Sequence, residues 1–180
     1  MEMNVISASF KHGENFKIGN FNVIGENVEV GDNVYIDNFV VIENDCKIGD
    51  NSYISNHAKL PEGTVIGKNC RIGGWCRTGK NSRVGDNVVM KAKSILGPPA
   101  EVGDDTTIGP YGILLHGTHT GDSLVTKVGK RCYVGVQAAV GPGVEVGDDI
   151  VVGAHCRVTK SIHEKGIYVG IPARKFKGKS

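Results

Sequence analysis

The sequence predicts an all-β fold, a triangular parallel β-solenoid of about eight coils with 18 residues each, followed by a short C-terminal tail. Three observations predict it: a six-residue repeat that begins at Ile18, glycine at 26 of 180 positions, and aromatic residues at only 6% of positions. This glycine share is high and lacks the triplet period of collagen. It therefore indicates frequent tight turns and argues against a helical core.

The repeat comprises 24 hexads, of which 18 start between Ile18 and Thr120 and six start in a shifted frame between Val128 and Val158. The first position is Ile, Val or Leu in 21 hexads, the second is Gly in 17, and the fifth is a small residue or Val in 20. A branched aliphatic residue followed by glycine is typical of a short strand and a turn. Three such sides close one coil, and the first and fifth positions are expected to point inward.

The limits of the repeat predict three segments. Residues 1–17 are expected to form an N-terminal cap, residues 18–163 the solenoid, and residues 164–180 a basic tail at the other open end. The shift of frame predicts a small protruding loop at residues 121–127. The tail can meet phosphate groups, but no basic helix or nucleic-acid motif accompanies it, so we expect no nucleic-acid partner.

Each of the five cysteines stands at the fifth, inward position of its hexad, and no CxxC spacing occurs among Cys46, Cys70, Cys76, Cys132 and Cys156. We therefore interpret them as core residues and expect no metal site. Five unpaired thiols are typical of a reducing cytoplasm. No apolar run reaches the roughly 18 residues of a membrane span, and no signal peptide is visible at the start. The predicted location is cytoplasmic.

Every eighteenth residue falls in one column of the coils, and one such column is rich in rings: Phe21, Phe39, His57, Trp75, Lys93 and Tyr111. These side chains are expected to stack at one corner of the prism. Two interpretations remain open, namely that the rings stack only on one another, or that a neighbouring subunit buries this strip.

The segment before the frame shift, Leu114 to His119, is the strongest candidate for chemistry. Loops that protrude from a rigid scaffold often carry functional residues. His119 precedes an inward position and should point outward, whereas His116 is a turn residue. Glu101 lies 18 residues before His119, so stacking would place its carboxylate within reach of the imidazole and fix its tautomer. The alternative is an incidental surface pair.

The hexads resemble the left-handed parallel β-helix of the hexapeptide-repeat transferases over residues 18–163. The left hand and a homotrimer are what this resemblance implies. The order of His119, the loop, VGKRCYVG from Val128, VTK from Val158 and GIPAR from Gly170 resembles the acetyl-CoA-dependent O- and N-acetyltransferases, such as the maltose and galactoside enzymes.

The resemblance implies a cytoplasmic acetyltransferase that uses acetyl-CoA, needs no metal, and acts on a sugar, amino sugar or nucleotide sugar between subunits. His119 would be the general base for direct attack of the acceptor on the thioester. The amide of Val136, after Gly135, would bind the developing oxyanion. The other implied cofactor-binding residues are Tyr133, where the family has tryptophan, Gly153, Ala154, Thr159, Lys160, Arg174 and Lys177.

Two other functions compete with this interpretation. A non-catalytic β-solenoid scaffold is compatible with the hexads but leaves His119, the loop and the GIPAR segment unexplained. A γ-class carbonic-anhydrase-like zinc enzyme shares the fold, but needs a third histidine at a compatible height. The columns below the histidine cluster carry no such residue; they hold Lys80, Arg83, Pro98 and Glu101.

Overall fold

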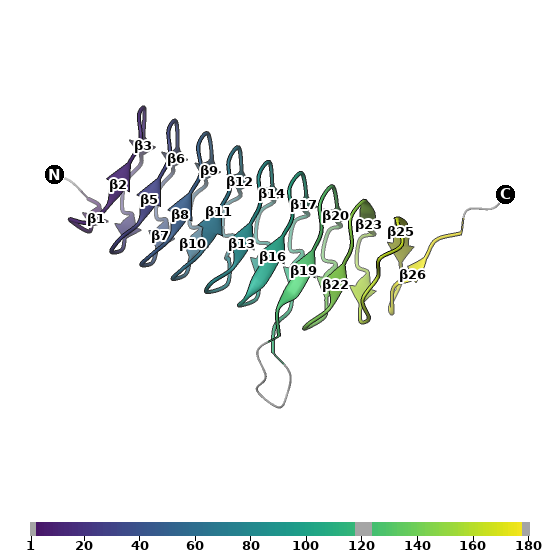
Figure 1. Ribbon diagram of the computed structural model, residues 1–180. Helices are drawn as coiled ribbons and strands as arrows, with labels where there is room; N and C mark the ends of the chain where they lie inside the picture. Colours follow the sequence, from purple (N-terminus) through teal and green to yellow (C-terminus); the bar gives the residue numbers. More distant parts are fainter. Residues whose placement is uncertain (1–2, 118–123, 178–180) are drawn as a thin grey trace.

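The computed structural model describes residues 3–117 and 124–177, and in these ranges the chain forms 26 short strands and no helix. Figure 1 shows the strands in successive coils that stack along one axis, with the two termini at opposite ends. About nine coils are present, and the all-β, left-handed parallel β-helix expected from the sequence is confirmed.

The strands form the three faces of a prism, here called sheets A, B and C. Sheet A contains β1 (Val5–Ile6), β4 (Val23–Ile24), β7 (Val41–Ile42), β10 (Lys59–Leu60), β15 (Ile95–Leu96), β18 (Ile113–Leu114), β21 (Ala139–Val140) and β24 (Arg157–Val158). Two single bridges through Arg77 join its halves. Sheet B contains β2 (Lys11–His12), β5 (Glu29–Val30), β8 (Lys47–Ile48), β11 (Val65–Ile66), β13 (Arg83–Val84), β16 (Ala100–Val102), β19 (Thr126–Val128) and β22 (Glu145–Val146).

Sheet C contains β3 (Lys17–Ile18), β6 (Tyr35–Ile36), β9 (Tyr53–Ile54), β12 (Arg71–Ile72), β14 (Val89–Met90), β17 (Thr107–Ile108), β20 (Tyr133–Val134), β23 (Ile150–Val152), β25 (Gly166–Val169) and β26 (Arg174–Lys175). All pairs are parallel except the β25–β26 hairpin. Strand partners lie 18 residues apart, as in Val5 with Val23, with two exceptions. The spacing is 26 once on each face, as between β16 and β19, and it is 16 between β23 and β25.

The core consists of the first and fifth positions of the hexads. Ile36 and Ile54 at first positions are fully buried, and all five cysteines at fifth positions are buried free thiols. The prediction that the cysteines fill the core is confirmed. Burial raises the pKa of the Cys46 thiol to about 11 and raises the pKa of the other four thiols, so none is a ready nucleophile.

The fourth position of the hexads makes the corner. Among the described residues, all 19 non-glycine residues with positive φ occupy this position, for example Asn51 (φ 58°) and Trp75 (φ 61°). Asparagine and aspartate tolerate the left-handed conformation best among non-glycine residues, and they supply ten of the 19. The repeat therefore needs a particular backbone conformation at each corner, while the side chain there can vary.

The N-terminal boundary of the solenoid differs from the prediction. Residues 5–18 form a complete first coil, because β1 pairs with β4 and β2 pairs with β5. This coil has no neighbour below it, so its fifth positions carry bulky rings, and Phe10 and Phe16 pack on the core with centroids 5.4 Å apart. The expected cap at 1–17 is thus, from Val5 onward, the terminal coil itself. The hexads of this coil were not recognised in the sequence because Phe10 and Phe16 stand at fifth positions, where most other hexads have small residues or valine.

The C-terminal segment is a hairpin, where the sequence predicts a tail. β25 continues sheet C beside β23, and β26 folds back against it. Tyr168 and Ala173 are nearly buried at 6% and 9% exposure, and the Tyr168 hydroxyl donates to the Glu164 carbonyl over 2.8 Å. The hairpin covers the last coil, as a cap of an open solenoid end must.

Candidate active site

The insertion that lengthens the spacing to 26 lies at the corner between sheets A and B, here called the loop corner. β18 ends at Leu114 and β19 begins at Thr126, so eight more residues than in the other coils leave the prism here. The predicted loop at 121–127 is corrected at its end, because Thr126 and Lys127 belong to β19. His119 and residues 121–123 lie outside the described residues.

The base of this loop is held by one buried hydroxyl. Thr126 Oγ1 donates to the Leu115 carbonyl over 2.6 Å and accepts from the Gly143 amide over 3.1 Å. Thr126 is completely buried. The two ends of the loop are therefore joined where they enter the prism, which gives the segment between them a rigid base.

A groove of about 520 Å³ lies on the sheet A side of the loop corner. Its lining includes Arg77, Ile95, Ile113, Leu115 and His116. His116 lies over Gly97, where an added Cβ would come within 2.7 Å of the imidazole Nδ1. Glycine at this position thus makes room for the ring. The groove has the size and the largely apolar lining of a small-molecule site. The sequence pointed to Leu115 and His116, within the segment Leu114 to His119, but not to Arg77, Ile95 or Ile113.

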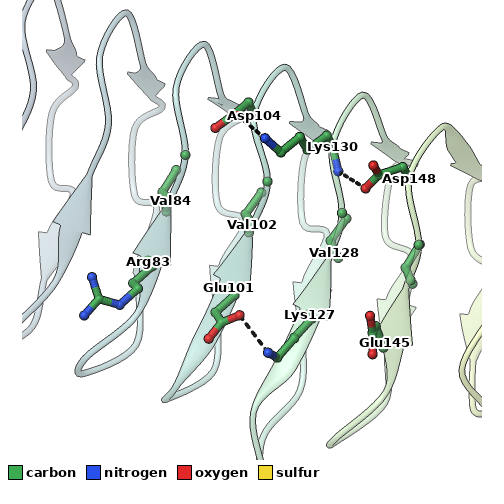
Figure 2. Close-up of a pocket in the computed structure, with 15 residues that line it drawn as sticks. Arg83, Val84, Glu101, Val102, Asp104, Lys127, Val128, Lys130, Glu145 and Asp148 are labelled. Atoms are coloured by element: carbon green, nitrogen blue, oxygen red, sulfur yellow. Dashed lines mark hydrogen bonds and ion pairs between the residues drawn. The ribbon is translucent and has the colours of Figure 1, made fainter.

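Sheet B carries charged side chains on the other side of the loop corner (Figure 2). Glu101 pairs in register with Lys127, and their charged groups lie 2.9 Å apart. The Glu101 carboxylate raises the pKa of Lys127 through this hydrogen bond. The predicted stacking of residue 119 on Glu101 is therefore wrong. The extra eight residues place Lys127 above this carboxylate.

Five of the predicted cofactor residues lie beside the corner between sheets C and A. Tyr133 and Val136 are each 37% exposed. A Cβ on Gly135 would lie 2.6 Å from the Ala154 nitrogen, so glycine permits the close approach of successive coils. The Val136 carbonyl accepts from the His155 amide over 2.8 Å, whereas the Val136 amide forms no hydrogen bond within the described part of the chain. This amide is an open donor.

The remaining predicted cofactor residues lie elsewhere. Thr159 and Lys160 follow β24 and are exposed at the loop corner. Arg174 is in β26, where its Nη1 donates to the Ala173 carbonyl over 2.8 Å, and Lys177 is exposed just beyond. The predicted residues thus form two main groups on opposite edges of sheet A, and one chain alone does not bring these groups together.

Two further observations concern other kinds of site. Across residues 3–117 and 124–177, no three His, Cys, Asp or Glu side chains are grouped closely enough to hold a metal ion. In the same ranges no helix has the length and apolar character of a membrane span.

Two protein-family models match this chain. Residues 1–118 match the family model of the GMPPB C-terminal domain. The chain belongs to this family. Residues 125–160 match the model of the hexapeptide repeat of succinyl-transferase. A search of the curated proteins finds no match.

Three solved structures with the same fold are acyltransferases. A mutant of AntD, an N-acyltransferase from Bacillus cereus in complex with dTDP and coenzyme A, is 25% identical, with a TM-score of 0.65 over 73% of this chain and 82% of that chain. UDP-N-acetylglucosamine O-acyltransferase (LpxA) from Moraxella catarrhalis is 18% identical, with a TM-score of 0.68 over 98% and 73%. UDP-N-acetylglucosamine acyltransferase from Campylobacter jejuni is 16% identical, with a TM-score of 0.67 over 98% and 73%.

These similarities confirm the resemblance found in the sequence. The chain is an acyltransferase of the hexapeptide-repeat family. The acceptor, the acyl group and the roles of individual residues are separate questions.

Proposed function

We propose that the protein transfers an acetyl group from acetyl-CoA to a hydroxyl or amine of a sugar, amino sugar or nucleotide sugar. The observation that carries this proposal is the insertion that lengthens the spacing between strand partners from 18 to 26. His116, at the start of this insertion, lines a groove of about 520 Å³. The similar AntD structure contains both dTDP and coenzyme A.

In the proposed reaction, His119 accepts the proton of the acceptor's hydroxyl or amine while the oxygen or nitrogen lone pair attacks the thioester carbonyl carbon. The carbon–sulfur bond of the tetrahedral intermediate then breaks. The CoA thiolate leaves with the bonding electron pair and takes the proton from the imidazolium, which restores the neutral histidine. No acyl-enzyme is needed, and the buried cysteines with raised pKa values favour direct transfer.

The Val136 amide is the proposed donor to the oxyanion, because it has no hydrogen-bond partner within the described part of the chain. Gly153 and Ala154 would border the pantetheine arm. Thr159, Lys160, Arg174 and Lys177 would face the amide or phosphate end of the cofactor. We assign no metal to the reaction.

We further propose a homotrimer with its active sites between subunits. The catalytic and cofactor groups occupy the two edges of sheet A, so neighbouring chains can complete one site with an edge from each. A cytoplasmic location is proposed from the five buried thiols, which suit a reducing compartment.

Calorimetric titration of acetyl-CoA into the purified protein tests this function. We expect saturable binding that Lys160→Ala weakens, followed by acetyl transfer to sugar-type acceptors in a thiol-release assay. Glu26→Ala, an exposed change several coils away, is the matched control and should bind normally. Absence of binding by the well-folded protein would reject the transferase function and favour the non-catalytic scaffold.

A further inference from the structure

The corner between sheets C and A carries a stack of rings, here called the ring ladder: Phe21, Phe39, His57 and Trp75. Successive centroids lie 5.0, 4.9 and 4.1 Å apart, and the planes are within 16° of parallel. The predicted stacking is confirmed for these four residues. Each inner ring has both faces covered by its neighbours, so only the ends of the ladder offer a free face.

The ladder is interrupted one coil after Trp75. The next position is Lys93, and the one after it is Tyr111, with the Lys93 ammonium 5.4 Å from the Tyr111 ring centroid. Two coils span about 9.6 Å, so a planar ring at the level of Lys93 would lie about 4.8 Å from each neighbouring ring, a normal stacking distance. Trp75 is 59% exposed and Tyr111 is 46% exposed, so both remain accessible.

The backbone around this gap also changes. Further down the same corner, Asn38 Oδ1 accepts from the Asn20 amide over 2.8 Å, and Asn56 Oδ1 accepts from the Asn38 amide over 3.2 Å. At the equivalent positions beside the gap stand Gly74 and Ala92, which have no such acceptor side chain. The backbone amides of Gly74 and Ala92 form no hydrogen bond within the described ranges, so two open donors border the gap.

Positive charge lies on the sheet C side of the gap. A cavity of about 280 Å³ there is lined by Arg71, Lys91 and Ala92, together with Tyr53 and Ser55. Within the described residues, Arg71, Lys91 and Lys93 form no ion pair. The Arg71 guanidinium lies 5.4 Å over the Tyr53 ring, which leaves its outer N–H groups available.

From this juxtaposition we propose that the protein binds a nucleoside phosphate at the gap in the ring ladder. The base inserts between Trp75 and Tyr111 in place of the Lys93 side-chain stem. The phosphate is bound by Arg71, Lys91 and the displaced Lys93 ammonium, with the amides of Gly74 and Ala92 as further donors. A base has two faces to stack, whereas the lysine it displaces makes one exposed cation–π contact, so the exchange is favourable.

The gap shares the C–A corner with Val136 but lies in earlier coils, and the loop corner with His116 lies across sheet A. Sugars without a base would gain little here, since the ring faces are accessible only to a flat group that fits between two coils. The charge of the site selects a nucleotide over an uncharged nucleoside.

Trp75 is the only tryptophan, so its fluorescence reports directly on the gap. Titration with UMP is expected to quench this fluorescence to saturation, and uridine is expected to bind more weakly. Tyr111→Leu, and separately Arg71→Gln, should weaken UMP binding at least about fivefold, the lower range for loss of one stacking partner. Phe21→Leu, at the far end of the ladder, is the matched control and should leave UMP binding unchanged.

Equilibrium dialysis with Trp75→Phe and Trp75→Leu separates binding from the optical signal. The phenylalanine variant should retain UMP and the leucine variant should lose it. No saturable quenching, or equal affinity in Tyr111→Leu, would overturn the proposal. Competition by CoA would also overturn it, because the site would then belong to the cofactor's own nucleotide. Acetyl-CoA calorimetry on the same preparation tests the transferase function independently of these outcomes.

Discussion

The corner between sheets B and C and the corner between sheets C and A share one backbone conformation but use it differently. The first carries an asparagine ladder: Asn15, Asn33, Asn51, Asn69 and Asn87. Each amide donates to the next side chain over 3.1–3.2 Å, and Asn87 donates to Asp105 over 3.0 Å. The second corner carries the ring ladder, which breaks at Lys93.

The comparison shows which parts of the repeat are structural and which can take on chemistry. The asparagine ladder satisfies its own donors and acceptors from coil to coil, so it stabilises the prism and offers little to a ligand. The ring ladder has an interruption with accessible faces, and the third corner has the extra loop. The interruption of the ring ladder and the inserted loop are thus the two places where the repeat can take on chemistry.

The largest expected effect concerns the loop corner. His119→Ala should reduce acetyl transfer by about 10²–10⁴-fold, the usual contribution of a general base, while circular dichroism and thermal unfolding stay unchanged. His116→Ala is the matched control on the same segment. If it, and not His119→Ala, abolishes turnover, His116 is the base.

Asn51→Val should cost the most stability among corner changes. It removes two ladder hydrogen bonds and forces a β-branched residue into φ 58°, which together should lower the free energy of unfolding by about 2 kcal/mol. Urea denaturation measures this. Asn51→Gly keeps the backbone conformation available, so it should cost less; an equal cost would assign the whole effect to the hydrogen bonds.

A smaller loss is expected in the ring ladder. Phe39→Leu removes stacking on both Phe21 and His57 and should cost about 1 kcal/mol. Phe21→Leu removes only one stacked neighbour and should cost about half as much. If wild type and Phe39→Leu unfold at the same urea concentration, stacking of the rings contributes nothing to stability. That result would favour the interpretation that a second subunit buries the rings.

The ion pairs along the asparagine corner predict sensitivity to acid. Lys68 lowers the pKa of Asp50, Lys130 lowers that of Asp104, and Arg131 lowers that of Asp149. An aspartate whose pKa is lower in the folded than in the unfolded protein stabilises the fold at pH values above its unfolded pKa, which is near 4. This contribution is lost as the pH falls through the pKa of the folded state.

The urea midpoint should therefore fall below about pH 4. Lys130→Met should reduce that fall, because it removes the cation beside Asp104. An identical pH profile in the variant would show that this pair contributes no pH dependence.

The smallest effect is expected at Glu101. Its carboxylate is bound to exposed Lys127, so Glu101→Gln should change turnover and the urea midpoint very little. Lys127→Met is the companion variant and should behave alike. A loss of turnover of tenfold or more in Glu101→Gln alone would restore the orienting role that the sequence spacing suggested.

Most of the fold could be predicted from the hexads, because a short repeat dictates strand, turn and inward face locally. The cysteines at fifth positions are a clear case. The first coil escaped prediction because Phe10 and Phe16 stand where other coils have small residues. That substitution makes sense only at an open end, which the pattern alone does not locate.

The candidate site was less predictable. His116 and the insertion were found from the frame shift, but Arg77 and Ile95 of the groove belong to unremarkable hexads and carry no local signal. Glu101 was assigned a neighbour by a spacing of 18, and the structure has 26 at that point. The rule that residues 18 apart stack on one another fails wherever an insertion leaves the prism.

By itself, the sequence determined the coil, its buried columns and the order of motifs that resembles the acetyltransferases, because these properties depend on residues within one or two hexads. Only the tertiary structure decided which residues stand one above another after the insertion, which amides remain open, and that the cofactor positions lie on two edges of sheet A. Those facts depend on register between coils. Register is set by stacking along the axis of the prism, after the chain has turned three corners.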